Sequence, residues 1–536
     1  MGFDVRDEPW IPVRLREPVQ VGAVGERSVR LGMRELFRRA HEIVDLEVPL
    51  PPSASGLLRI LAALTARIAG HGGVRLDDVD VAEDVEDWVR LRARVLEAGR
   101  FDADAVDAYF DDEALAGRFD AFDPVRPFLQ DPRLAEQCVD KKGKPNPSGI
   151  NKLVFGRPTG VNGAVLFGHF NDGDPVPVPA AEALWHLIGQ LYYGPAGQCT
   201  PRQITAERAG SGDAGPLRKT VSFHPWAPDL FTSLVLSVPV PGAGGVDADE
   251  DDACPWEADA LPDPLGPAVP ATWPGRLLTG RARHAVLLVP AGHQMVGDAY
   301  VSWSTHAPAP DVRDPFLVLD RPRNGEGPDF PRLANGRRAL WRDLDALLLK
   351  DVPGQSKRPL ILQDVPRSIA PVLRVRAYGF DQDGQQRDSG WYEATTPPVL
   401  GWQEDVDAAQ ALRVRACRQA AEEIGDRLSF AARLAWKLTI DGGEDMAEKV
   451  RLDRKKPGPW DSRALAVFWP RAEQVFWTLL TTDGANSAPH RPFADAALDA
   501  LDDAIGIMRA DVRVARARNR ARRTIRTAVP RPAPAA

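Results

Sequence analysis

The chain has 536 residues, 44% of them hydrophobic and 26% charged, and a formal net charge of −8 at pH 7. This length allows two or three domains with a substantial core. The acidic balance excludes a polycation that coats nucleic acid indiscriminately, so any such contact must come from local basic patches. The four cysteines form neither a metal motif nor a disulfide framework. We find no signal peptide and no long apolar run, and expect a cytoplasmic protein.

Residues 1–398 predict a mixed α/β domain. The segments PWIPVRL and VQVGAV predict an N-terminal hairpin. Apolar residues at helical spacing predict helices over residues 32–43, 53–70, 84–96, 104–109 and 338–349. Strands are expected over residues 284–289, 315–319 and 371–378, whereas residues 231–240 fit a strand or a helix.

The segment 161–203 organises this domain. It predicts a small-residue strand, a polar turn and an apolar helix that ends at Gly194. The next residues have almost no side-chain bulk: Gly194, Pro195, Ala196, Gly197 and Gln198. Such a loop lets another backbone approach closely and can present N–H groups to phosphate or to groove edges. The alternative is a core helix capped by Gly194 and followed by an ordinary turn.

Two glycine-rich stretches have simpler interpretations. Gly210, Gly212 and Gly215 fit G-x-G-x-x-G, but no apolar strand precedes them and no helix follows, so we reject a dinucleotide site. Residues 241–270 are rich in Pro, Gly and acidic side chains. We expect a surface loop there, ordered at its edges and mobile in its middle.

Residues 399–536 predict an antiparallel four-helix bundle with a disordered tail. Apolar residues form a seam from Leu412 to Ala435, and the pattern repeats over residues 464–480 and 493–524. The last of these helices carries a basic stripe at alternating four- and three-residue steps, made of Arg509, Arg513, Arg516, Arg520 and Arg523. The stripe suits a nucleic-acid backbone or, equally, a solvated face with acidic neighbours.

Catalytic and cofactor motifs are missing from the sequence. We find no phosphate-binding P-loop, no zinc-protease motif and no nucleophile elbow, and we predict no cofactor or metal. Cys199 and His186 lie close in sequence and leave open a hydrolytic enzyme of unknown substrate. No orienting third group stands at a recognisable spacing, so we favour a packed histidine over a catalytic one.

Several stretches, taken in order, resemble the CasA family, the large subunit of the type I-E CRISPR surveillance complex Cascade. The opening DEPWIPVRL resembles the family's first strand, and residues 49–70 are similar to its early apolar helix. The block from Asn162 to Gly197 resembles its crRNA-contacting loop, helix and glycine loop. The polar turn after Tyr378 resembles its wedge hairpin, and the C-terminal part resembles its four-helix bundle.

The resemblance implies a non-catalytic subunit that recognises the PAM in double-stranded DNA, helps to open the duplex and recruits a helicase–nuclease. The implied partners are other Cascade subunits, the crRNA 5′ handle and target DNA, without a membrane. Gly194–Gln198 would lie against the PAM minor groove, with Asp381, Gln382 and Gln385 as the wedge. The loop touching the crRNA handle would comprise Phe167, Gly168, His169, Phe170 and Asn171.

Two features depart from the family pattern. Arg281 and Arg283 stand where the family has a basic finger for the minor groove, and Pro195 with Ala196 interrupts the glycine run. In the bundle, Arg509, Arg513, Arg516 and Arg520 would contact the DNA backbone. A scaffold without DNA contact remains a further alternative.

Overall fold

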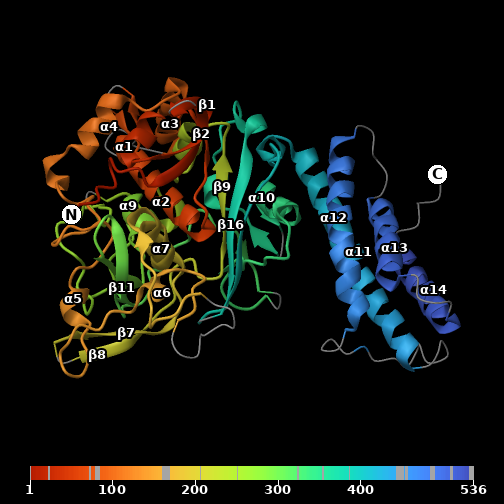
Figure 1. Ribbon diagram of the computed structural model, residues 1–536. Helices are drawn as coiled ribbons and strands as arrows, with labels where there is room; N and C mark the ends of the chain where they lie inside the picture. The colour runs from red at the N-terminus through yellow and green to blue at the C-terminus, as the bar shows by residue number, and fades with distance from the viewer. Residues whose placement is uncertain are drawn as a thin grey trace. The chain divides into compact units, whose positions relative to one another are not determined.

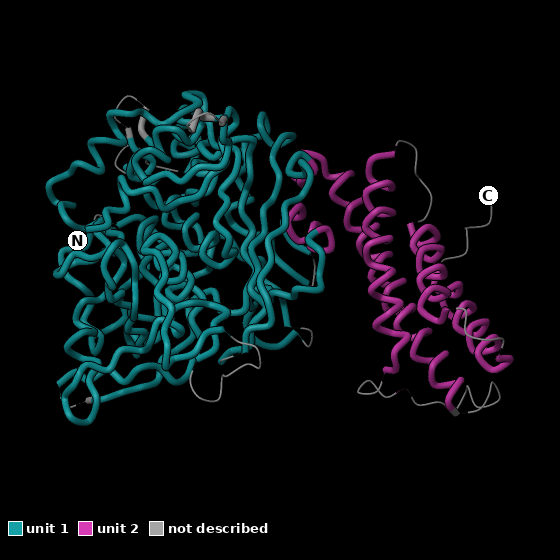
Figure 2. Tube along the Cα trace, in the orientation of Figure 1, with its two compact units in different colours: residues 1–340, 350–401 teal, residues 341–349, 402–536 magenta. Residues whose placement is uncertain are grey.

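The computed structural model describes residues 2–529 except 22–23, 72–73, 79–84, 160–168, 206, 250, 323–324, 353–354, 386, 442–451, 453–456, 483–488 and 507–510. The chain forms two compact units (Figure 2). The first contains Met1–Leu340 and Lys350–Gly401, and the second contains Trp341–Leu349 and Trp402–Ala536. The division predicted at residue 398 assigns residues 341–349 to the first domain, whereas the structure groups them with the C-terminal helices.

Helix α2 (Pro51–Ile68) is the central element of the first unit. Two prolines occupy its first turn, where a missing N–H costs no hydrogen bond, and every residue of the helix is buried. It packs against α7 (Ala180–Tyr193), α8 (Leu230–Leu236), α9 (Gly275–Thr279) and β16 (Arg374–Gln382) (Figure 1). A Cβ on Gly56 would lie 2.6 Å from both Ile188 and Tyr192, so glycine permits the close approach of α2 and α7.

The N-terminal hairpin forms with different strands from those predicted. One long strand, β1 (Ile11–Val21), contains the last five residues of PWIPVRL and the first three of VQVGAV. It pairs antiparallel with β2 (Val24–Leu31) and with β3 (Ile43–Leu46), and Ile11 opposes Leu31. The prediction was wrong because the proline-interrupted apolar pattern of β1 looks like two strands separated by a turn, while β2 is mostly polar.

Three further sheets position the candidate site. The order β17–β16–β9 joins β17 (Asp388–Thr395) and β9 (Val221–Trp226) to the two edges of β16. The order β10–β11–β6 joins β10 (His284–Pro290), β11 (Met295–Trp303) and β6 (Val178–Pro179), which leads directly into α7. β7 (Gly197–Ile204) and β8 (Glu207–Gly212) form a two-stranded ribbon.

Shorter elements complete the unit. The order β13–β12–β15–β14 joins Phe330–Pro331, Leu319–Asp320, Ser356–Lys357 and Asp351–Val352, and β4 (Gly70–His71) pairs with β5 (Val74–Arg75). The remaining α-helices are α1 (Met33–Arg38), α3 (Val85–Ala98), α4 (Ala103–Phe110), α5 (Leu134–Gln137) and α6 (Ile150–Leu153). The helix predicted over 32–43 is shorter, because residues 39–42 form turns and Ile43 begins β3. The segment 231–240, which fitted a strand or a helix, begins within helix α8. Of the strand predicted over 315–319, only the end belongs to a strand, β12.

The acidic segment 241–270 is more firmly attached than its composition predicts. Arg67 of α2 forms ion pairs with Asp252 at 2.8 Å, Glu257 at 3.1 Å and Asp77 at 2.7 Å. Tyr109 donates a hydrogen bond to Glu257, and Cys254 is fully buried. Asp252 and Glu257, in the part predicted to be mobile, pair with a buried arginine instead of meeting solvent.

The second unit is a bundle of four helices: α11 (Ala408–Asp441), α12 (Pro459–Thr481), α13 (His490–Ile505) and α14 (Val512–Arg526). α11 packs against each of the other three. The single helix predicted over 493–524 is in fact two helices, because Gly506 adopts a φ of +69° at the end of α13. α10 (Leu344–Leu348) packs on α11, where Asp345 pairs with Arg418 at 2.6 Å.

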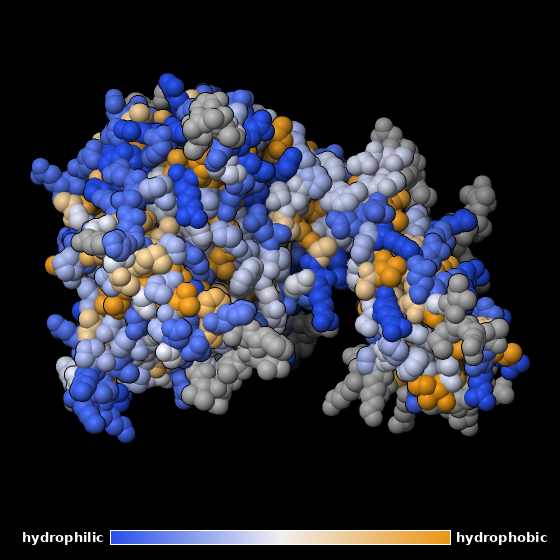
Figure 3. Space-filling model, in the orientation of Figure 1, coloured by the Kyte–Doolittle hydropathy of each residue, from blue (hydrophilic) through white to orange (hydrophobic). Residues whose placement is uncertain are grey.

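The surface in view is mainly hydrophilic, with small separate apolar areas (Figure 3). Among the described residues, no helix is both long enough and apolar enough to cross a membrane.

Candidate functional site

The loop after α7 is shaped by two glycines with different roles. Gly194 caps the helix and is buried, and a Cβ there would lie 2.6 Å from both the Gln190 carbonyl oxygen and His284 Cε1. Gly197 begins β7 with a φ of +105°, a conformation that favours glycine, and a Cβ there would meet nothing within 4 Å. The predicted loop is therefore held tightly at its first residue and open at Gly197, while Gln198 is exposed.

His284 supports this loop from β10. Its Nε2 donates a hydrogen bond to the Pro195 carbonyl oxygen at 3.1 Å, in the tautomer that carries the proton on Nε2. Burial lowers the pKa of His284 to about 4, so the imidazole is neutral at pH 7. Its Nδ1 is buried and has no hydrogen-bond partner among the described residues. A neutral ring thus fixes the path of the loop.

The polar turn of the predicted wedge lies between β16 and β17. Asp381 pairs in register with Gly390, and Gln382 with Asp388. The Gln382 side chain is only 7% exposed, and its Nε2 donates to Asp388 Oδ1 at 2.9 Å. Gln385, by contrast, is exposed at the turn. The structure therefore corrects the wedge prediction for Gln382, whose amide is already bonded within the protein; Gln386 lies outside the described residues.

The loop and the turn, almost two hundred residues apart in the chain, lie side by side. The Ala196 N–H donates to the Gly384 carbonyl oxygen at 3.4 Å. Gln382 Nε2 also lies 3.5 Å from the Tyr193 carbonyl oxygen, at the end of α7. The sequence order alone predicts no such contact. The Gly194–Gln198 loop and the 382–388 turn form one continuous surface, which we call the loop–turn junction.

Arg218 joins the two sides of the loop–turn junction. Its guanidinium donates to the carbonyl oxygens of Tyr193 at 3.0 Å, Asp383 at 2.9 Å and Gln385 at 3.3 Å. It also pairs with Asp388 at 2.8 Å, and the side chain is 3% exposed. Burial lowers the pKa of Arg218, against the opposing effect of Asp388. Five N–H donors in a planar fork suit such multiple contacts. Sequence reasoning missed this residue because it belongs to no motif.

Lys219 is an exposed cation beside the junction, as Arg387 is within the turn. Its backbone N–H donates to Gln382 Oε1 at 3.3 Å, its φ is +59°, and its side chain is exposed. Among the described residues, no carboxylate pairs with its ammonium group. A non-glycine residue in the left-handed region costs conformational energy that surrounding contacts must offset. Here the Ala334 N–H group donates a hydrogen bond to the Lys219 carbonyl oxygen at 2.9 Å, and this contact helps to offset that cost.

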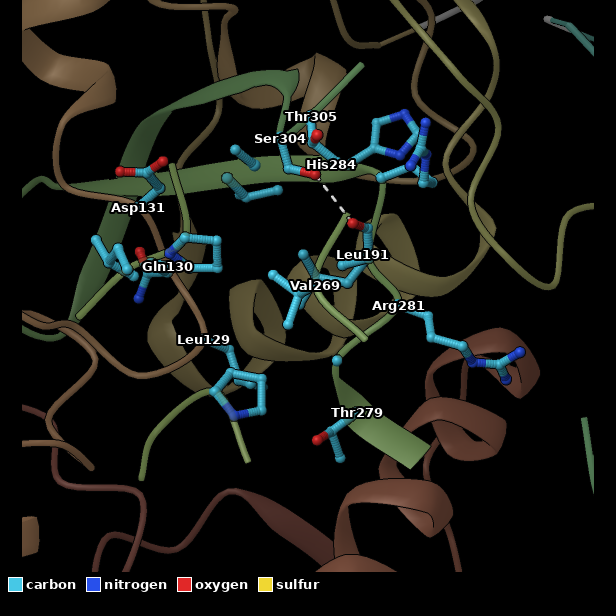
Figure 4. Close-up of a pocket in the computed structure, with 18 of the residues that line it drawn as sticks. Leu129, Gln130, Asp131, Leu191, Val269, Thr279, Arg281, His284, Ser304 and Thr305 are labelled. Atoms are coloured by element: carbon cyan, nitrogen blue, oxygen red, sulfur yellow. Dashed lines mark hydrogen bonds between the residues drawn. The ribbon is translucent and has the colours of Figure 1, made fainter. Parts of the chain in front are cut away.

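The two arginines predicted as a basic finger both form ion pairs within the protein. Arg281 pairs with Asp314, which also pairs with the fully buried Arg59 at 3.0 Å, and Arg283 pairs with Asp213. Figure 4 shows the neighbouring cavity of about 190 Å³, and Arg281 extends away from its centre. The prediction of a free basic finger at either residue does not fit these ion pairs. Sequence offered no means to foresee them, because both carboxylates are distant in the chain.

The predicted crRNA-binding loop is described only in part. Phe167 and Gly168 lie outside the described residues. His169, Phe170 and Asn171 are exposed, and Asn171 Oδ1 accepts the N–H groups of Gly173 and Asp174 at 2.9 Å each. This Asx turn gives the exposed loop a defined backbone path.

The basic stripe of the bundle lies on α14. Arg513, Arg516, Arg520 and Arg523 are exposed and have no carboxylate partner among the described residues. Arg518 and Arg522, on a neighbouring face, both pair with Asp502 of α13. Arg509 lies outside the described residues. The helix therefore separates arginines that hold the bundle together from arginines that face solvent.

The structure does not support a nucleophile pair formed by Cys199 and His186. Burial raises the pKa of the Cys199 thiol, whose polar neighbour is Ser302 Oγ at 3.9 Å. His186 Nδ1 instead accepts the Phe155 N–H at 3.3 Å, and its Nε2 lies 3.8 Å from Glu182. Each group is thus occupied elsewhere, and a protonated thiol is a weak nucleophile. Among the described residues, no cluster of His, Cys, Asp and Glu could hold a metal ion.

The chain thus combines a mixed α/β unit, which carries the loop–turn junction, with a four-helix bundle. A family model described as "CRISPR-associated protein Cse1" matches residues 4–506. The chain therefore belongs to the Cse1 family, also called CasA, as its resemblance predicted. The CRISPR-associated protein CasA/Cse1 of Thermus thermophilus is 28% identical over 513 residues, covering 90% of this chain and 86% of that protein.

Solved structures agree with this assignment. A chain of a "CRISPR RNA-guided surveillance complex" is 39% identical, with a TM-score of 0.82, and the match covers 98% of this chain and 99% of that one. The Cse1 protein of Acidimicrobium ferrooxidans is 21% identical, with a TM-score of 0.70 and 98% of each chain covered. This second likeness shows that the fold itself is shared.

Proposed function

We propose that this protein is the large, non-catalytic subunit of a type I-E CRISPR RNA-guided surveillance complex, in which it recognises the PAM in double-stranded DNA. Membership of the Cse1 family and the 39% identity to a chain of such a complex support the general assignment. The single observation that carries the specific one is the loop–turn junction. A side-chain-poor loop and an exposed polar turn meet there through the 3.4 Å bond between Ala196 and Gly384.

The junction suits the minor groove of DNA. That groove is narrow and displays a degenerate pattern of hydrogen-bonding groups, so a reader that works by shape must bring its backbone close. Gly197 has neither a side chain nor neighbours that would obstruct such an approach. Lys219 provides the positive charge that Arg281 and Arg283 cannot, because both arginines are already paired. We assign to Lys219 the contact with DNA phosphate or with the groove.

The turn supplies the wedge. Gln385 is exposed and can enter the base stack, where its amide replaces some hydrogen bonds of the opened pair. Gln382 and Asp381 act beneath it: Gln382 ties the turn to Lys219 and Tyr193, and Asp381 Oδ2 accepts the Gly336 N–H at 3.1 Å. Hydrogen bonds from Gln382 and Asp381 thus hold the base of the turn in place, and a wedge that enters a base stack needs such support.

The remaining roles follow the family resemblance. The exposed residues His169–Asn171 contact the 5′ handle of the crRNA, and the solvent-facing arginines of α14 bind the DNA backbone. The complex, in the cytoplasm, then recruits a helicase–nuclease that degrades the target. These steps need other subunits, RNA and DNA, and no reaction catalysed by this chain.

Duplex opening by the assembled complex tests the wedge. We expect Gln385→Ala to slow opening of an intact duplex bearing the PAM while leaving binding to a pre-melted target unchanged. Gln203→Ala, an exposed glutamine on β7, is the matched control. Equal losses on both targets would contradict the wedge, and binding that does not depend on the PAM in the wild-type complex would contradict the function itself.

The salt dependence of DNA binding tests Lys219. Loss of one phosphate contact lowers the slope of log affinity against log salt by about 0.9. We expect this change for Lys219→Ala but not for Arg283→Ala, whose guanidinium is paired with Asp213. An unchanged slope for Lys219→Ala would remove Lys219 from the interface.

A further inference from the structure

A second feature of the first unit is an aromatic pocket beside α7, away from the loop–turn junction. It measures about 470 Å³ and is lined by five rings, together with Arg157 and Glu182: Phe155, Phe170, Trp185, His186 and Trp391. Trp391 comes from β17 of the wedge hairpin, and Phe170 from the exposed segment that follows residue 168. We call this the aromatic pocket.

Two rings of the aromatic pocket are unusually exposed for their size. Trp391 is 39% exposed and Phe170 is 36% exposed, whereas Trp185 and His186 form a buried floor. Trp391 meets Phe380 edge-on, with ring centroids 5.6 Å apart, and its outer edge lies 3.8 Å from a Cβ position on Gly156. Two large rings at an open mouth thus keep more than a third of their surface exposed, and Arg157 lies over one of them, Phe170.

Positive charge lies over these rings. The Arg157 guanidinium sits 4.2 Å from the Phe170 ring centroid, and Arg30 lies 5.4 Å from that of Trp185. Arg157 donates to the Val176 carbonyl oxygen at 2.7 Å and has no carboxylate within ion-pair distance among the described residues. Glu182 provides one acceptor group at the mouth, where its side chain is 41% exposed.

From this arrangement we infer that the aromatic pocket binds one unstacked nucleobase of the guide RNA. Aromatic rings and arginine planes are the groups on which proteins stack bases splayed out of single-stranded RNA, and the neighbouring arginines suit its phosphates. The Glu182 carboxylate can accept a hydrogen bond from the exocyclic amino group of a base, a group that uracil lacks. The inference rests on the proposed function, which places guide RNA at His169–Asn171.

Affinity of the chain for an RNA-loaded complex that lacks it, measured without DNA, is the first test. Base stacking on an aromatic side chain predicts about tenfold weaker binding for Trp391→Ala and for Phe170→Ala. Trp391→Phe keeps a π-face and retains most of the affinity. Phe330→Ala is the matched control, since Phe330 is 40% exposed and lies outside the pocket.

Abasic substitutions along the 5′ end of the guide RNA then identify the base. One position should weaken the wild-type chain about tenfold and leave Trp391→Ala unaffected, since the partner of that base is already lost. Replacing that base by uracil should weaken the wild type but not Glu182→Ala. If every abasic effect is the same in both chains, the pocket holds no base and serves a protein subunit instead, which overturns the inference.

The two proposals fail separately. Trp391→Ala complexes that still contain the chain should discriminate PAM sequences as the wild type does, because the loop–turn junction is intact. Wild-type complexes that show abasic coupling but no PAM dependence would reject the proposed function and leave the base pocket standing.

Discussion

Arginine has opposite roles in the loop–turn junction and in helix α14. The Arg218 side chain is 3% exposed, and its guanidinium donates hydrogen bonds to three protein carbonyl oxygens and one carboxylate. On α14, the four described arginines of the basic stripe face solvent without a carboxylate partner among the described residues. In the junction, the Arg218 charge is buried and holds the backbone in a defined shape. The stripe instead presents exposed charges that no ion pair holds in one geometry. The first suits recognition and the second suits sequence-independent attraction.

Loss of Arg218 should have the largest effect. Arg218→Ala removes the guanidinium donor from the Asp383 and Gln385 carbonyl oxygens and leaves Gln382 as the donor to Asp388 and Tyr193, and we expect the free energy of unfolding of the first unit to fall by about 3 kcal/mol. Arg218→Lys should not restore it, because an ammonium group cannot span the four acceptors. Urea denaturation measures the change. Arg208→Ala, at an exposed arginine bonded to one carbonyl oxygen, should cost less than about 0.5 kcal/mol.

Protonation of His284 should loosen the same junction at acidic pH. Its pKa of about 4 in the folded chain lies below the ordinary value near 6.5, so the unfolded chain binds the proton first. The corresponding stability is present above about pH 6.5 and is lost as the pH falls toward 4, amounting to at most about 3 kcal/mol. Protonated Nδ1 would be a buried donor without an acceptor among the described residues.

The measurement is the free energy of unfolding between pH 7 and pH 4.5 for wild type and His284→Gln. The glutamine amide can donate to the Pro195 carbonyl oxygen without titrating. We expect the variant to show a shallower pH dependence over this window. Identical slopes in both chains would mean that His284 does not titrate as described.

A substitution at Gly197 can separate the effect of backbone strain from the effect of a lost contact between the loop and DNA. Gly197→Ala places a Cβ at a φ of +105° and should lower stability by about 1 kcal/mol, with about tenfold weaker binding of PAM-bearing DNA by the complex. Gly99→Ala is the matched control: its φ is +71°, its Cβ would also meet nothing within 4 Å, and it lies far along the chain. If both variants weaken DNA binding equally, the loop contacts no DNA.

The α14 stripe should give the smallest effect of a single substitution. Arg520→Ala removes an unpaired charge and should lower affinity severalfold at low salt, with a reduction of about 0.9 in the salt slope. Arg522→Ala instead breaks the pair with Asp502, so it should lower the melting temperature and leave the slope unchanged. The opposite pattern would show that the stripe is only a solvated face.

Local patterns predicted local structure well. α2 and α7 follow from long apolar periodicity with proline at or just before the start, and the Gly194 cap follows from its place after the last apolar residue. β16 was expected from alternation, although it extends to Gln382. The resemblance, carried by motif order, correctly indicated the family. In these cases the deciding forces act between neighbours in sequence.

Long-range pairing was beyond prediction. Arg67 forms ion pairs with acidic residues almost two hundred positions away. The segment 241–270 is therefore held to α2, although its composition is typical of a mobile loop. From the sequence, Arg281 is interpreted as a free cation, whereas in the structure it forms an ion pair with Asp314. For the candidate site, sequence indicated the loop and the turn but neither their contact nor the roles of Arg218 and Lys219, because a single chain order says nothing about which carbonyl oxygens meet.

The assignment of residues 341–349 to the helical unit limits how the chain can be divided. Trp341, 2% exposed, packs its ring 4.7 Å from that of Phe476, and Arg342 pairs with Glu422. The polypeptide therefore crosses between the units three times, at residues 340–341, 349–350 and 401–402. A fragment that begins at Trp402 would expose an indole-sized hole and lose the ion pairs Arg342–Glu422 and Asp345–Arg418, so a stand-alone bundle needs the short segment grafted onto its amino terminus.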